Sequence, residues 1–413
     1  MDIKIFPSKL CGEIDIVSSK SYAHRAIIAA SLCDVESVIR NVELSDDIRA
    51  TLSAVAAIGA DFKIEGKTIY VSKTGKLPQK ADFDCNESGS TIRFLIPIVS
   101  ALGIAGTFTG RGRLPERPLH TLYNLLTEHG VNCDYNGRLP FKSRGQLSSG
   151  KFYIEGNISS QFITGLMFAL PLLSYDSEII LTTKLESSSY VDLTIDVLRK
   201  FGIEISKTET GFIIKGNQKY KSCDITVEGD WSNAAFFIAV NALGSNVKID
   251  GLNINSKQGD RAGESLIRSF SLDFSKPCEE ISIDASDIPD LVPILATVAS
   301  FSNNLTRIYN AARLRLKESD RLTTICDGLT KIGADIKVTD DGLIIKGKKC
   351  LNGGVTVQSH NDHRIAMSMA VAAIFCKNPV AIIGAECVNK SYPGFFSEIK
   401  KLGGAFDVFT MGR

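Results

Sequence analysis

The sequence lacks any apolar run long enough to cross a membrane. Its longest apolar stretch, residues 94–105, contains Pro97 and Gly103, whereas a membrane-spanning helix needs about 20 apolar residues. The first seven residues alternate like a β-strand and show no apolar core of a signal peptide. We therefore expect a cytoplasmic protein without a membrane partner.

The sequence also lacks a surplus of charge of either sign. Its 47 lysines and arginines nearly balance its 46 aspartates and glutamates, which leaves a net charge of +1. A protein that binds nucleic acid through a broad surface is usually basic. The balance argues against a nucleic-acid partner, and any binding of small anions must come from the local placement of cations.

Metal and cofactor motifs are missing as well. The ten cysteines are scattered without a C-x-x-C pair, which favours reduced thiols over disulfides or a zinc site. His360 and His363 have no further cluster of metal ligands beside them, and the phosphate-binding pattern G-x-x-x-x-G-K-[ST] is absent. We expect neither a metal nor a cofactor.

What the sequence does contain is a six-fold internal repeat. A helical pattern ends at a small residue and a strand-like segment follows, at Gly59, Gly130, Gly202, Ser271, Gly333 and Gly403. The intervals between these positions are 62 to 72 residues. Glycine fits the left-handed residue that ends many helices. Because 413 residues are too many for one ordinary core, we expect two domains of three repeats each.

Each repeat also has a second, more apolar helix that begins near a small or polar residue. These helices are expected to start near Ser19, Ser88, Ser159, Asp230, Ile288 and Asn361. A helix that is apolar on all sides is buried. The sequence therefore predicts an α/β fold in which buried helices form the core of each domain and outer sheets surround them.

The starts of these helices are rich in cations. Helix amino termini attract anions, because their N–H groups are unpaired and carry partial positive charge. In this chain the helix starts add Lys20, Arg25, Arg93, Arg117, Lys317, Arg321 and Arg364. The pattern predicts a site for a strongly anionic small molecule that the two domains close upon.

The segment from Arg313 to Arg321 is the densest of these stretches, with four cations and two carboxylates. We expect a helix capped at Ser319 or an earlier residue, on which Lys317 and Arg321 point the same way. A solvated, salt-bridged helix start is the plainer alternative for such a charge run. In another repeat Asp290 stands against an apolar helix, and we expect its carboxylate to be partly desolvated and basic.

Together these segments resemble the EPSP synthase family, and the resemblance extends from Ser18 to Pro393. It is carried by Lys20-Ser21 with Arg25, Gly89-Ser90 with Arg93, Leu114–Pro118 with Arg117, Ser159–Phe162, Ile288–Asp290, Lys317–Arg321, Asn361–Arg364 and Lys390–Pro393. The resemblance implies two inverse α/β-barrel-like domains of three repeats, joined by crossovers near Ser18 and Glu228. The first domain would comprise residues 1–18 and 229–413, and the second residues 19–228.

The resemblance also implies an activity. The family transfers the carboxyvinyl group of phosphoenolpyruvate to the 5-hydroxyl of shikimate 3-phosphate and releases phosphate, in the pathway to chorismate and the aromatic amino acids. We expect a monomer that acts on these small anions without cofactor or metal, and that is a target of glyphosate, a mimic of phosphoenolpyruvate.

Site residues are carried over from the family position by position. The contacts to shikimate 3-phosphate fall on Lys20, Ser21, Arg25, Ser159, Ser160, Gln161, Ser187, Asp290 and Lys317. The contacts to phosphoenolpyruvate fall on Lys20, Gly89, Arg117, Gln161, Arg321, Arg364 and Lys390. As catalytic residues we expect Glu318 to protonate the methylene carbon and Asp290 to take the hydroxyl proton, with Lys20 as a partner in either step.

Three positions depart from the family pattern. Glu87 stands where the family usually has asparagine, and Ser90 replaces threonine. The spacing before Lys317 also differs, so that the family's asparagine contact falls on either Asn310 or Arg313.

Two alternatives remain open. The sister family that acts on UDP-N-acetylglucosamine shares the fold, but it has Lys-Asn where this chain has Lys20-Ser21, and it usually carries a reactive cysteine in a loop. No cysteine lies between Cys85 and Cys133 here. A DNA clamp also has six α/β repeats, but its inner helices should be basic along their length, whereas these cations gather at helix starts with acids beside them.

Overall fold

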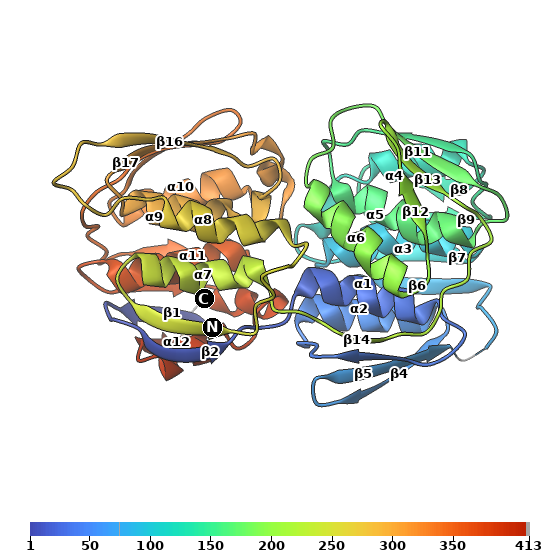
Figure 1. The fold of residues 1–413 in the computed structure, drawn as a ribbon, viewed down its shortest axis with the longest axis horizontal. Helices are drawn as coiled ribbons and strands as arrows, with labels where there is room; N and C mark the ends of the chain where they lie inside the picture. The colour runs from blue at the N-terminus through green and yellow to red at the C-terminus, as the bar shows by residue number, and fades with distance from the viewer. Residues whose placement is uncertain (74, 410–413) are drawn as a thin grey trace. The chain divides into compact units, whose positions relative to one another are not determined.

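The computed structural model describes residues 1–73 and 75–409, and they form two compact units (Figure 1). Unit 1 comprises Met1–Val17 and the chain from Gly229 onward, and unit 2 comprises Ser18–Glu228. Each unit has a hydrophobic core of its own. In the described ranges no helix is both long and apolar enough to cross a membrane.

Unit 2 contains three copies of one arrangement of helices and strands. In the second copy β6 pairs in parallel with β7, and β9 joins β7 antiparallel, which gives the sheet order β6-β7-β9-β8. The third copy has the same topology, with order β10-β11-β13-β12. In the first copy the leading strand is β14, which comes from the end of the unit and pairs in parallel with β3.

The elements of unit 2 run as follows: α1 (Lys20–Ser31), β3 (Ser37–Arg40), α2 (Asp46–Ala57), β4 (Ala60–Glu65), β5 (Thr68–Lys73), β6 (Lys80–Asp84), α3 (Gly89–Ala101), β7 (Ala105–Thr109), η1 (Leu114–Glu116), α4 (His120–Glu128), β8 (Asn132–Asp134), β9 (Phe141–Arg144), β10 (Lys151–Ile154), α5 (Ser160–Ala169), η2 (Leu170–Leu172), β11 (Ser177–Leu181), α6 (Ser188–Lys200), β12 (Ile205–Lys207), β13 (Gly211–Ile214) and β14 (Asp224–Thr226).

Unit 1 contains the other three copies, of which two have four-stranded sheets with orders β16-β17-β19-β18 and β20-β21-β1-β22. In the latter the strand β1 is contributed by the start of the chain and pairs with β21 and β22. The remaining copy is incomplete, because only β2 and β15 pair. The strand expected after Ser271 does not form, and residues 272–274 lie in irregular backbone.

The elements of unit 1 run as follows: β1 (Asp2–Phe6), β2 (Cys11–Asp15), α7 (Trp231–Ala242), β15 (Asn246–Asp250), η3 (Gly259–Arg261), α8 (Ala262–Arg268), β16 (Glu279–Asp284), η4 (Pro289–Leu291), α9 (Val292–Ser300), β17 (Asn304–Tyr309), η5 (Ala312–Leu316), α10 (Arg321–Lys331), β18 (Asp335–Val338), β19 (Leu343–Lys346), β20 (Thr356–Gln358), α11 (His363–Phe375), β21 (Val380–Ile383), η6 (Ala385–Lys390), α12 (Phe395–Lys401) and β22 (Ala405–Phe409).

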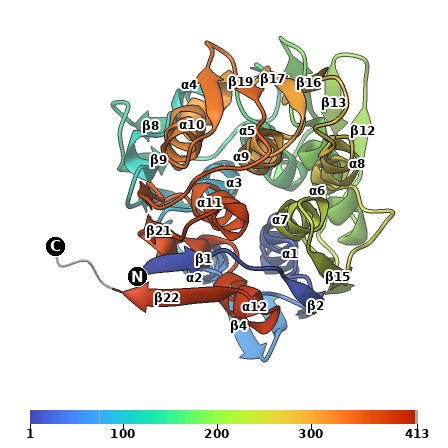
Figure 2. The same cartoon turned by 90° about the vertical axis from the view of Figure 1, so that its left-hand side faces the viewer.

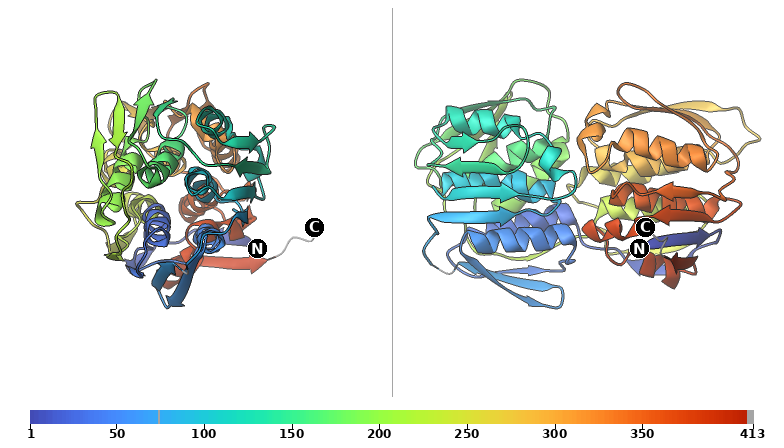
Figure 3. Two further views of the ribbon diagram at one scale, coloured as in Figure 1. Left: turned by 90° about the vertical axis from the view of Figure 1, so that its right-hand side faces the viewer. Right: turned by 180° about the vertical axis from the view of Figure 1, so that it is seen from behind.

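The apolar helices lie inside each unit and the strands lie outside them, as Figures 2 and 3 show. Nearly every residue of α3, α5, α9 and α11 is buried, as helices without a polar face must be. The predicted α/β fold with buried helices and outer sheets is therefore confirmed.

Small polar residues begin most of these buried helices, as expected. The side chain of the N-cap residue accepts a backbone N–H at Ser19 of α1, Ser88 of α3, Ser159 of α5, Asp230 of α7 and Asp362 of α11. Helix α9 is different, because the short helix η4 precedes it and its N-cap, Leu291, has no capping side chain.

The glycines predicted to end helices do so in left-handed backbone. Their φ angles lie between 77° and 107° at Gly59, Gly130, Gly202, Gly333 and Gly403. A residue with a Cβ is strained there. Ser271, in contrast, does not take a positive φ angle. This fits the absence of the expected strand after it.

Helix α5 packs closely on α3 through a glycine. A Cβ added at Gly165 would overlap the carbonyl oxygen of Arg93 and lie 3.1 Å from the Pro97 ring. Backbone atoms cannot rotate away as a flexible side chain can, so the two helices would have to separate. Because Arg93 is one of the predicted anion-site cations, this contact also sets where that side chain begins.

We predict that Gly165→Ala lowers the free energy of unfolding by about 1–3 kcal/mol, the usual cost of overpacking a core. Thermal or urea unfolding of the purified protein measures the change. The control is Gly394→Ala, since Gly394 has φ of −83° and a Cβ there would only touch the Tyr392 ring at 3.8 Å. Equal stability of the two variants would contradict the close α3–α5 contact.

Candidate active site

The predicted site residues of unit 1 meet at a buried guanidinium. Arg321, the first residue of α10, has a side chain that is only 2% exposed. Its Nη1 donates to Asp290 Oδ1 at 2.8 Å, and its Nη2 donates to Glu318 Oε2 at 2.7 Å. Its Nε donates to Asp362 Oδ2 at 2.8 Å. A charge can stay buried in this way only when opposite charges and hydrogen bonds surround it.

Two further cations approach Asp290 in the same cluster. Lys317 Nζ lies 3.5 Å from Asp290 Oδ1, and Arg364 Nη2 lies 3.8 Å from Asp290 Oδ2. Burial alone would raise the pKa of the Asp290 carboxyl, but the charges of Lys317, Arg364 and Arg321 hold that pKa well below its usual range. The prediction of a basic Asp290 was therefore wrong. It considered the apolar helix that follows Asp290, but not the cations that other segments bring to it.

Burial has the opposite consequence for Lys317. It lowers the pKa of the Lys317 ammonium, although the negative charge of Asp290 works against this. A lysine with a lowered pKa exchanges protons more readily than an exposed one. Lys317 is therefore the cation of the cluster most able to respond to a change in its surroundings.

Helix α10 does not begin where the sequence suggested. Its N-cap is Asp320, whose side chain accepts the backbone N–H of Thr323. Lys317 lies before the helix, in extended backbone directly after η5. Lys317 and Arg321 therefore do not share a helix face, although both approach Oδ1 of Asp290. The alternative of a solvated charge run also fails for Arg321, because its side chain is buried.

The start of α11 helps to hold two of the predicted cations, Arg364 and Lys390. His360 and Asn361 take left-handed backbone, with φ of 52° and 55°, directly before the cap Asp362. Lys390 Nζ donates to the carbonyl oxygen of Asn361 at 2.6 Å. Arg364 Nη1 donates to the carbonyl oxygen of Ser232 at 3.1 Å. Lys390 and Arg364 are thus held by backbone carbonyls at helix starts.

Sequence reasoning missed two carboxylates of this region. Asp362 was expected only to begin a helix, yet it is fully buried and holds Arg321. Asp260 is also buried, and the hydroxyl of Ser232 donates to it. Burial, with the nearby negative charge of Asp290, raises the pKa of Asp260 to about 6. Neither role could be inferred from spacing, because each carboxylate acts on a segment far away in the chain.

Asn310 and Arg313, the two candidates for the family's asparagine contact, lie in different surroundings. Arg313 Nη2 donates to the carbonyl oxygen of Ser286, close to Asp290 in the chain. Asn310 takes left-handed backbone with φ of 56°, and its backbone N–H donates to Asp341 at 3.1 Å.

The predicted residues of unit 2 form a second group at the starts of α1, α3, α5 and α6. Lys20, the first residue of α1, makes an ion pair of 2.7 Å with Asp47 of α2. The side chains of these two residues are 16% and 12% exposed, so the pair is partly buried. The sequence analysis did not include Asp47, although the pair Asp46-Asp47 at a helix start was a visible signal.

The start of α3 brings two guanidinium groups to Gly89. A Cβ at Gly89 would lie 2.6 Å from Nη1 of both Arg117 and Arg93. Arg93 Nη1 donates to Gln161 Oε1 at 3.1 Å, and Gln161 Nε2 donates to Ser90 Oγ at 3.0 Å. The arrangement joins α3 to α5 and leaves room for two cations only because residue 89 has no side chain.

Arg25 is held almost entirely by neutral groups. Its three nitrogens donate to the carbonyl oxygen of Ser21 at 2.7 Å, to Thr194 Oγ1 at 2.8 Å and to the carbonyl oxygen of Tyr190 at 3.1 Å. Its guanidinium also lies over the Phe94 ring, 5.2 Å from the centroid. Burial lowers the pKa of Arg25 to about 10. Among the described residues no carboxylate pairs with Arg25, so its charge remains available to attract an anion.

Three serines of this group also lie at helix starts. Ser159 caps α5 by accepting the backbone N–H of Gln161 at 3.3 Å, and Ser160 is the first residue of that helix. Ser187 precedes α6 in left-handed backbone with φ of 52° and is buried. A non-glycine residue in this conformation is strained and often marks a functional position.

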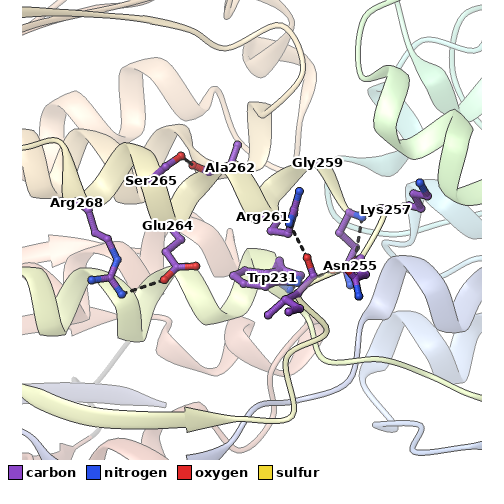
Figure 4. Close-up of a pocket in the computed structure, with 12 residues that line it drawn as sticks. Trp231, Asn255, Lys257, Gly259, Arg261, Ala262, Glu264, Ser265 and Arg268 are labelled. Atoms are coloured by element: carbon purple, nitrogen blue, oxygen red, sulfur yellow. Dashed lines mark hydrogen bonds and ion pairs between the residues drawn. The ribbon is translucent and has the colours of Figure 1, made fainter.

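Figure 4 shows a separate hollow of about 800 Å³ in unit 1, beside α8 and Trp231. None of the predicted site residues lines it. Arg268, one of the cations that line it, makes an ion pair of 2.9 Å with Glu264, and Arg261 donates to the Ile254 carbonyl at 2.5 Å.

We predict that Arg321→Met lowers the free energy of unfolding by about 3–5 kcal/mol, because three carboxylates lose their buried counter-charge. The matched control is Arg268→Met in the same unit, since Arg268 is 73% exposed in its pair with Glu264. An exposed pair of this kind contributes about 0.3–0.5 kcal/mol. Urea unfolding measures both variants, and a similar small loss in each would show that Arg321 does not hold the cluster together.

Comparison with known proteins identifies the family of the chain. The family model described as EPSP synthase (3-phosphoshikimate 1-carboxyvinyltransferase) matches residues 6–399. The chain is 49% identical to the 3-phosphoshikimate 1-carboxyvinyltransferase of Clostridium novyi (strain NT) over the full length of both, and 48% identical to that of Clostridium perfringens (strain 13), covering 97% of this chain and 98% of the relative.

A solved structure of EPSP synthase from Acinetobacter baumannii has the same fold. It superimposes with a TM-score of 0.81 at 24% identity and covers 99% of this chain and 100% of its own. The family match, the full-length relatives and the shared fold lead to one assignment: the chain belongs to the EPSP synthase family.

Proposed function

We propose that the chain transfers the carboxyvinyl group of phosphoenolpyruvate to the 5-hydroxyl of shikimate 3-phosphate and releases phosphate. The observation that carries this proposal is the Arg321 cluster, in which two partly exposed carboxylates, Asp290 and Glu318, share one buried guanidinium. The reaction needs anion binding and two proton transfers in one place, and this cluster supplies groups for both.

Each unit is proposed to supply part of the binding surface. The cations and hydroxyls at the starts of α1, α5 and α6, together with Asp290 and Lys317, would hold shikimate 3-phosphate. Phosphoenolpyruvate would be held by Lys20, Gly89, Arg117, Gln161, Arg321, Arg364 and Lys390. This division is supported by the gathering of these residues at helix starts within each unit, where N–H groups and side-chain cations attract oxyanions together.

The proton transfers are assigned to the two carboxyl groups. The hydroxyl oxygen forms a bond to C2 of phosphoenolpyruvate, while a proton moves from Glu318 to the methylene carbon and the hydroxyl proton moves to Asp290. Phosphate then leaves C2 while Glu318, now a carboxylate, takes one proton back from the new methyl group, which restores the carbon–carbon double bond. Because its pKa is low, Asp290 is ionised and can accept a hydrogen bond from the hydroxyl, and it becomes a stronger base only when a ligand draws the neighbouring cations away from it.

The transfer to UDP-N-acetylglucosamine is not favoured as an alternative, because the full-length relatives are named 3-phosphoshikimate 1-carboxyvinyltransferases. The deciding test is phosphate release from phosphoenolpyruvate with either acceptor. We expect release with shikimate 3-phosphate and none above background with UDP-N-acetylglucosamine. The reverse result would overturn the proposal.

We also propose that the enzyme is a cytoplasmic monomer. All ten cysteines are free thiols in the structure, as is usual in a reducing compartment. Light scattering at micromolar concentration should give a mass close to the chain's 44.8 kDa. A mass twice as large would contradict the monomer.

We predict that Glu318→Gln lowers kcat by about 10²–10⁴, the usual contribution of a general acid, and leaves substrate binding nearly unchanged. It should also slow deuterium incorporation at the methylene carbon of phosphoenolpyruvate during turnover in D₂O. Asp290→Asn should lower kcat and weaken shikimate 3-phosphate as well, because the amide disturbs the bond to the substrate hydroxyl.

Rate measurements and calorimetry on both variants separate these roles. The control is Glu264→Gln, which removes an exposed carboxylate of α8 that pairs with Arg268 at the protein surface. Normal turnover of Glu318→Gln would mean that Glu318 only helps to hold Arg321.

A further prediction concerns Gly89. In Gly89→Ala the new Cβ would lie within 2.6 Å of the Arg117 and Arg93 guanidiniums, so these cations must move into the space for phosphoenolpyruvate. Glyphosate is longer than phosphoenolpyruvate and should lose more binding. We expect the inhibitory concentration of glyphosate to rise by a much larger factor than the KM for phosphoenolpyruvate does. Equal increases would show that residue 89 does not discriminate between the two ligands.

A further inference from the structure

A chain of buried polar side chains crosses the core of unit 2 and joins three helices. His24 of α1 lies with Nδ1 2.7 Å from Thr51 Oγ1 of α2. Thr51 Oγ1 lies 2.7 Å from Thr91 Oγ1 of α3, and Thr91 Oγ1 donates to Ser88 Oγ at 2.7 Å. All four residues are at most 1% exposed. Polar groups this deep cost stability unless they are bonded to one another.

The directions of these hydrogen bonds follow from counting protons. Thr91 has one hydroxyl proton, which it gives to Ser88. The single proton of Thr51 then goes to Thr91 Oγ1 at 2.7 Å or to the carbonyl oxygen of Asp47 at 3.3 Å. In both cases Thr51 has no proton left for the ring, so Nδ1 of His24 carries one and donates it to Thr51. His24 is thereby fixed as the neutral tautomer with the proton on Nδ1. Its Nε2 has no hydrogen-bond partner among the described residues.

The surroundings of His24 favour the neutral ring. Burial lowers the pKa of the imidazole well below its usual range, and the charges of Lys20 and Arg25 lower it further. A protonated ring would also place a second donor, Nε2–H, where no described group accepts it. The hydrogen-bond chain and the electrostatics therefore require the same protonation state.

Both ends of the chain lie next to proposed substrate contacts. His24 is one helical turn after Lys20, and Thr51 is one turn after Asp47, so the Lys20–Asp47 pair and the His24–Thr51 bond are two successive links between α1 and α2. At the other end Ser88 is the N-cap of α3 and immediately precedes Gly89. The chain thus connects Lys20 to the backbone at Gly89.

We propose that His24, Thr51 and Thr91 are positioning residues that fix the amino end of α1, with Lys20, relative to the amino end of α3, with Gly89. They act through Lys20 and Gly89 and do not touch substrate themselves. The inference rests on the proposed function, because these two positions are assigned to phosphoenolpyruvate. A rigid link suits this task, since a small displacement of an anion-binding cation already weakens catalysis.

The first test examines the chain itself and does not depend on activity. The protein has five histidines, so ¹⁵N labelling of histidine gives five pairs of ring signals, and the pair lost in His24→Asn belongs to His24. We expect the pattern of the Nδ1–H tautomer, unchanged from pH 8 to pH 5.5. A ring with its proton on Nε2, or a ring that is protonated by pH 6, would overturn the hydrogen-bond chain.

The second test separates positioning from simple stabilisation. Thr51→Val and Thr91→Val each remove one link, and Ser100→Ala removes another buried hydroxyl from the far end of α3, where Ser100 Oγ donates to the Ile96 carbonyl at 2.9 Å. We expect kcat/KM for phosphoenolpyruvate to fall about tenfold in the two valine variants, the equivalent of one hydrogen bond. It should stay within about twofold in Ser100→Ala, although the melting temperatures fall in all three. Equal kinetic losses in all three would overturn the positioning role.

Substitutions of His24 provide the rescue experiment. Asparagine can present an N–H close to the place of Nδ1, so His24→Asn should keep kcat/KM for phosphoenolpyruvate within about threefold of the wild type. Leucine fills the space without a donor, and His24→Leu should lose about tenfold. If both variants lose activity equally, the donor is irrelevant and the proposal fails.

The same residue should make stability depend on pH. Because the folded pKa of His24 is depressed, the unfolded chain takes up the proton first as the pH falls below about 6.5. Protonation of His24 in the unfolded chain should therefore raise the unfolding equilibrium constant by up to about tenfold for each pH unit that the pH falls below this value. His24→Asn should remove that contribution. An identical pH dependence in both proteins would mean that His24 is not held neutral. Absence of phosphate release by the wild type would refute the proposed function alone.

Discussion

The burial of the Arg321 guanidinium constrains the candidate site more than any other single contact. Its partners, Asp290, Glu318 and Asp362, come from segments before α9, α10 and α11, and the guanidinium fixes their mutual distances. Removing either side of such a cluster leaves uncompensated charge in a poorly hydrated place. The starts of three helices are therefore held in register by electrostatics as well as by packing.

The same cluster couples anion binding to proton chemistry. Three cations, Arg321, Lys317 and Arg364, face three carboxylates, so the cluster is formally neutral. The charges of Lys317, Arg364 and Arg321 hold the pKa of Asp290 low, so an anion that draws one of these cations toward itself raises that pKa. Ligand binding thus makes Asp290 easier to protonate. The same region contains Asp260, whose pKa is raised to about 6, so this carboxyl group takes up a proton more easily than an ordinary aspartate.

Unit 2 solves the problem of buried cations differently. Arg25 rests on backbone carbonyls, a hydroxyl and an aromatic ring, and Arg93 rests on an amide and a backbone carbonyl. Neutral acceptors stabilise a guanidinium without cancelling its charge. The charge of Arg25 therefore remains available for a ligand, whereas the Arg321 cluster is largely balanced. Lys20 differs from Arg25, because it pairs with Asp47.

Local signals in the sequence predicted most of the fold. Helix stops and helix caps depend on the conformation of only one or two residues. The structure agrees with the predicted stops, such as Gly59 and Gly333, and with the predicted caps at Ser19, Ser88 and the start of α11, where Asp362 is the cap. The prediction of a strand after Ser271 was wrong, because Ser271 does not form a left-handed helix stop. The sheet of this repeat consists of β2 and β15. The start of α10 was wrong by a few residues, because Ser319 and Asp320 are both good caps and only Asp320 is used.

Properties that depend on distant segments could not be read in the same way. The low pKa of Asp290 needs Lys317 and Arg364, which lie 27 and 74 residues further along the chain. In sequence alone, His24, Thr51 and Thr91 are three unremarkable polar residues in apolar helices, and each would be satisfied by its own helix backbone. Only the packing of α1, α2 and α3 shows that they bond to one another. Residue types at helix starts therefore suggested which chemistry the chain performs, whereas the protonation state of each group follows from contacts that only the fold creates.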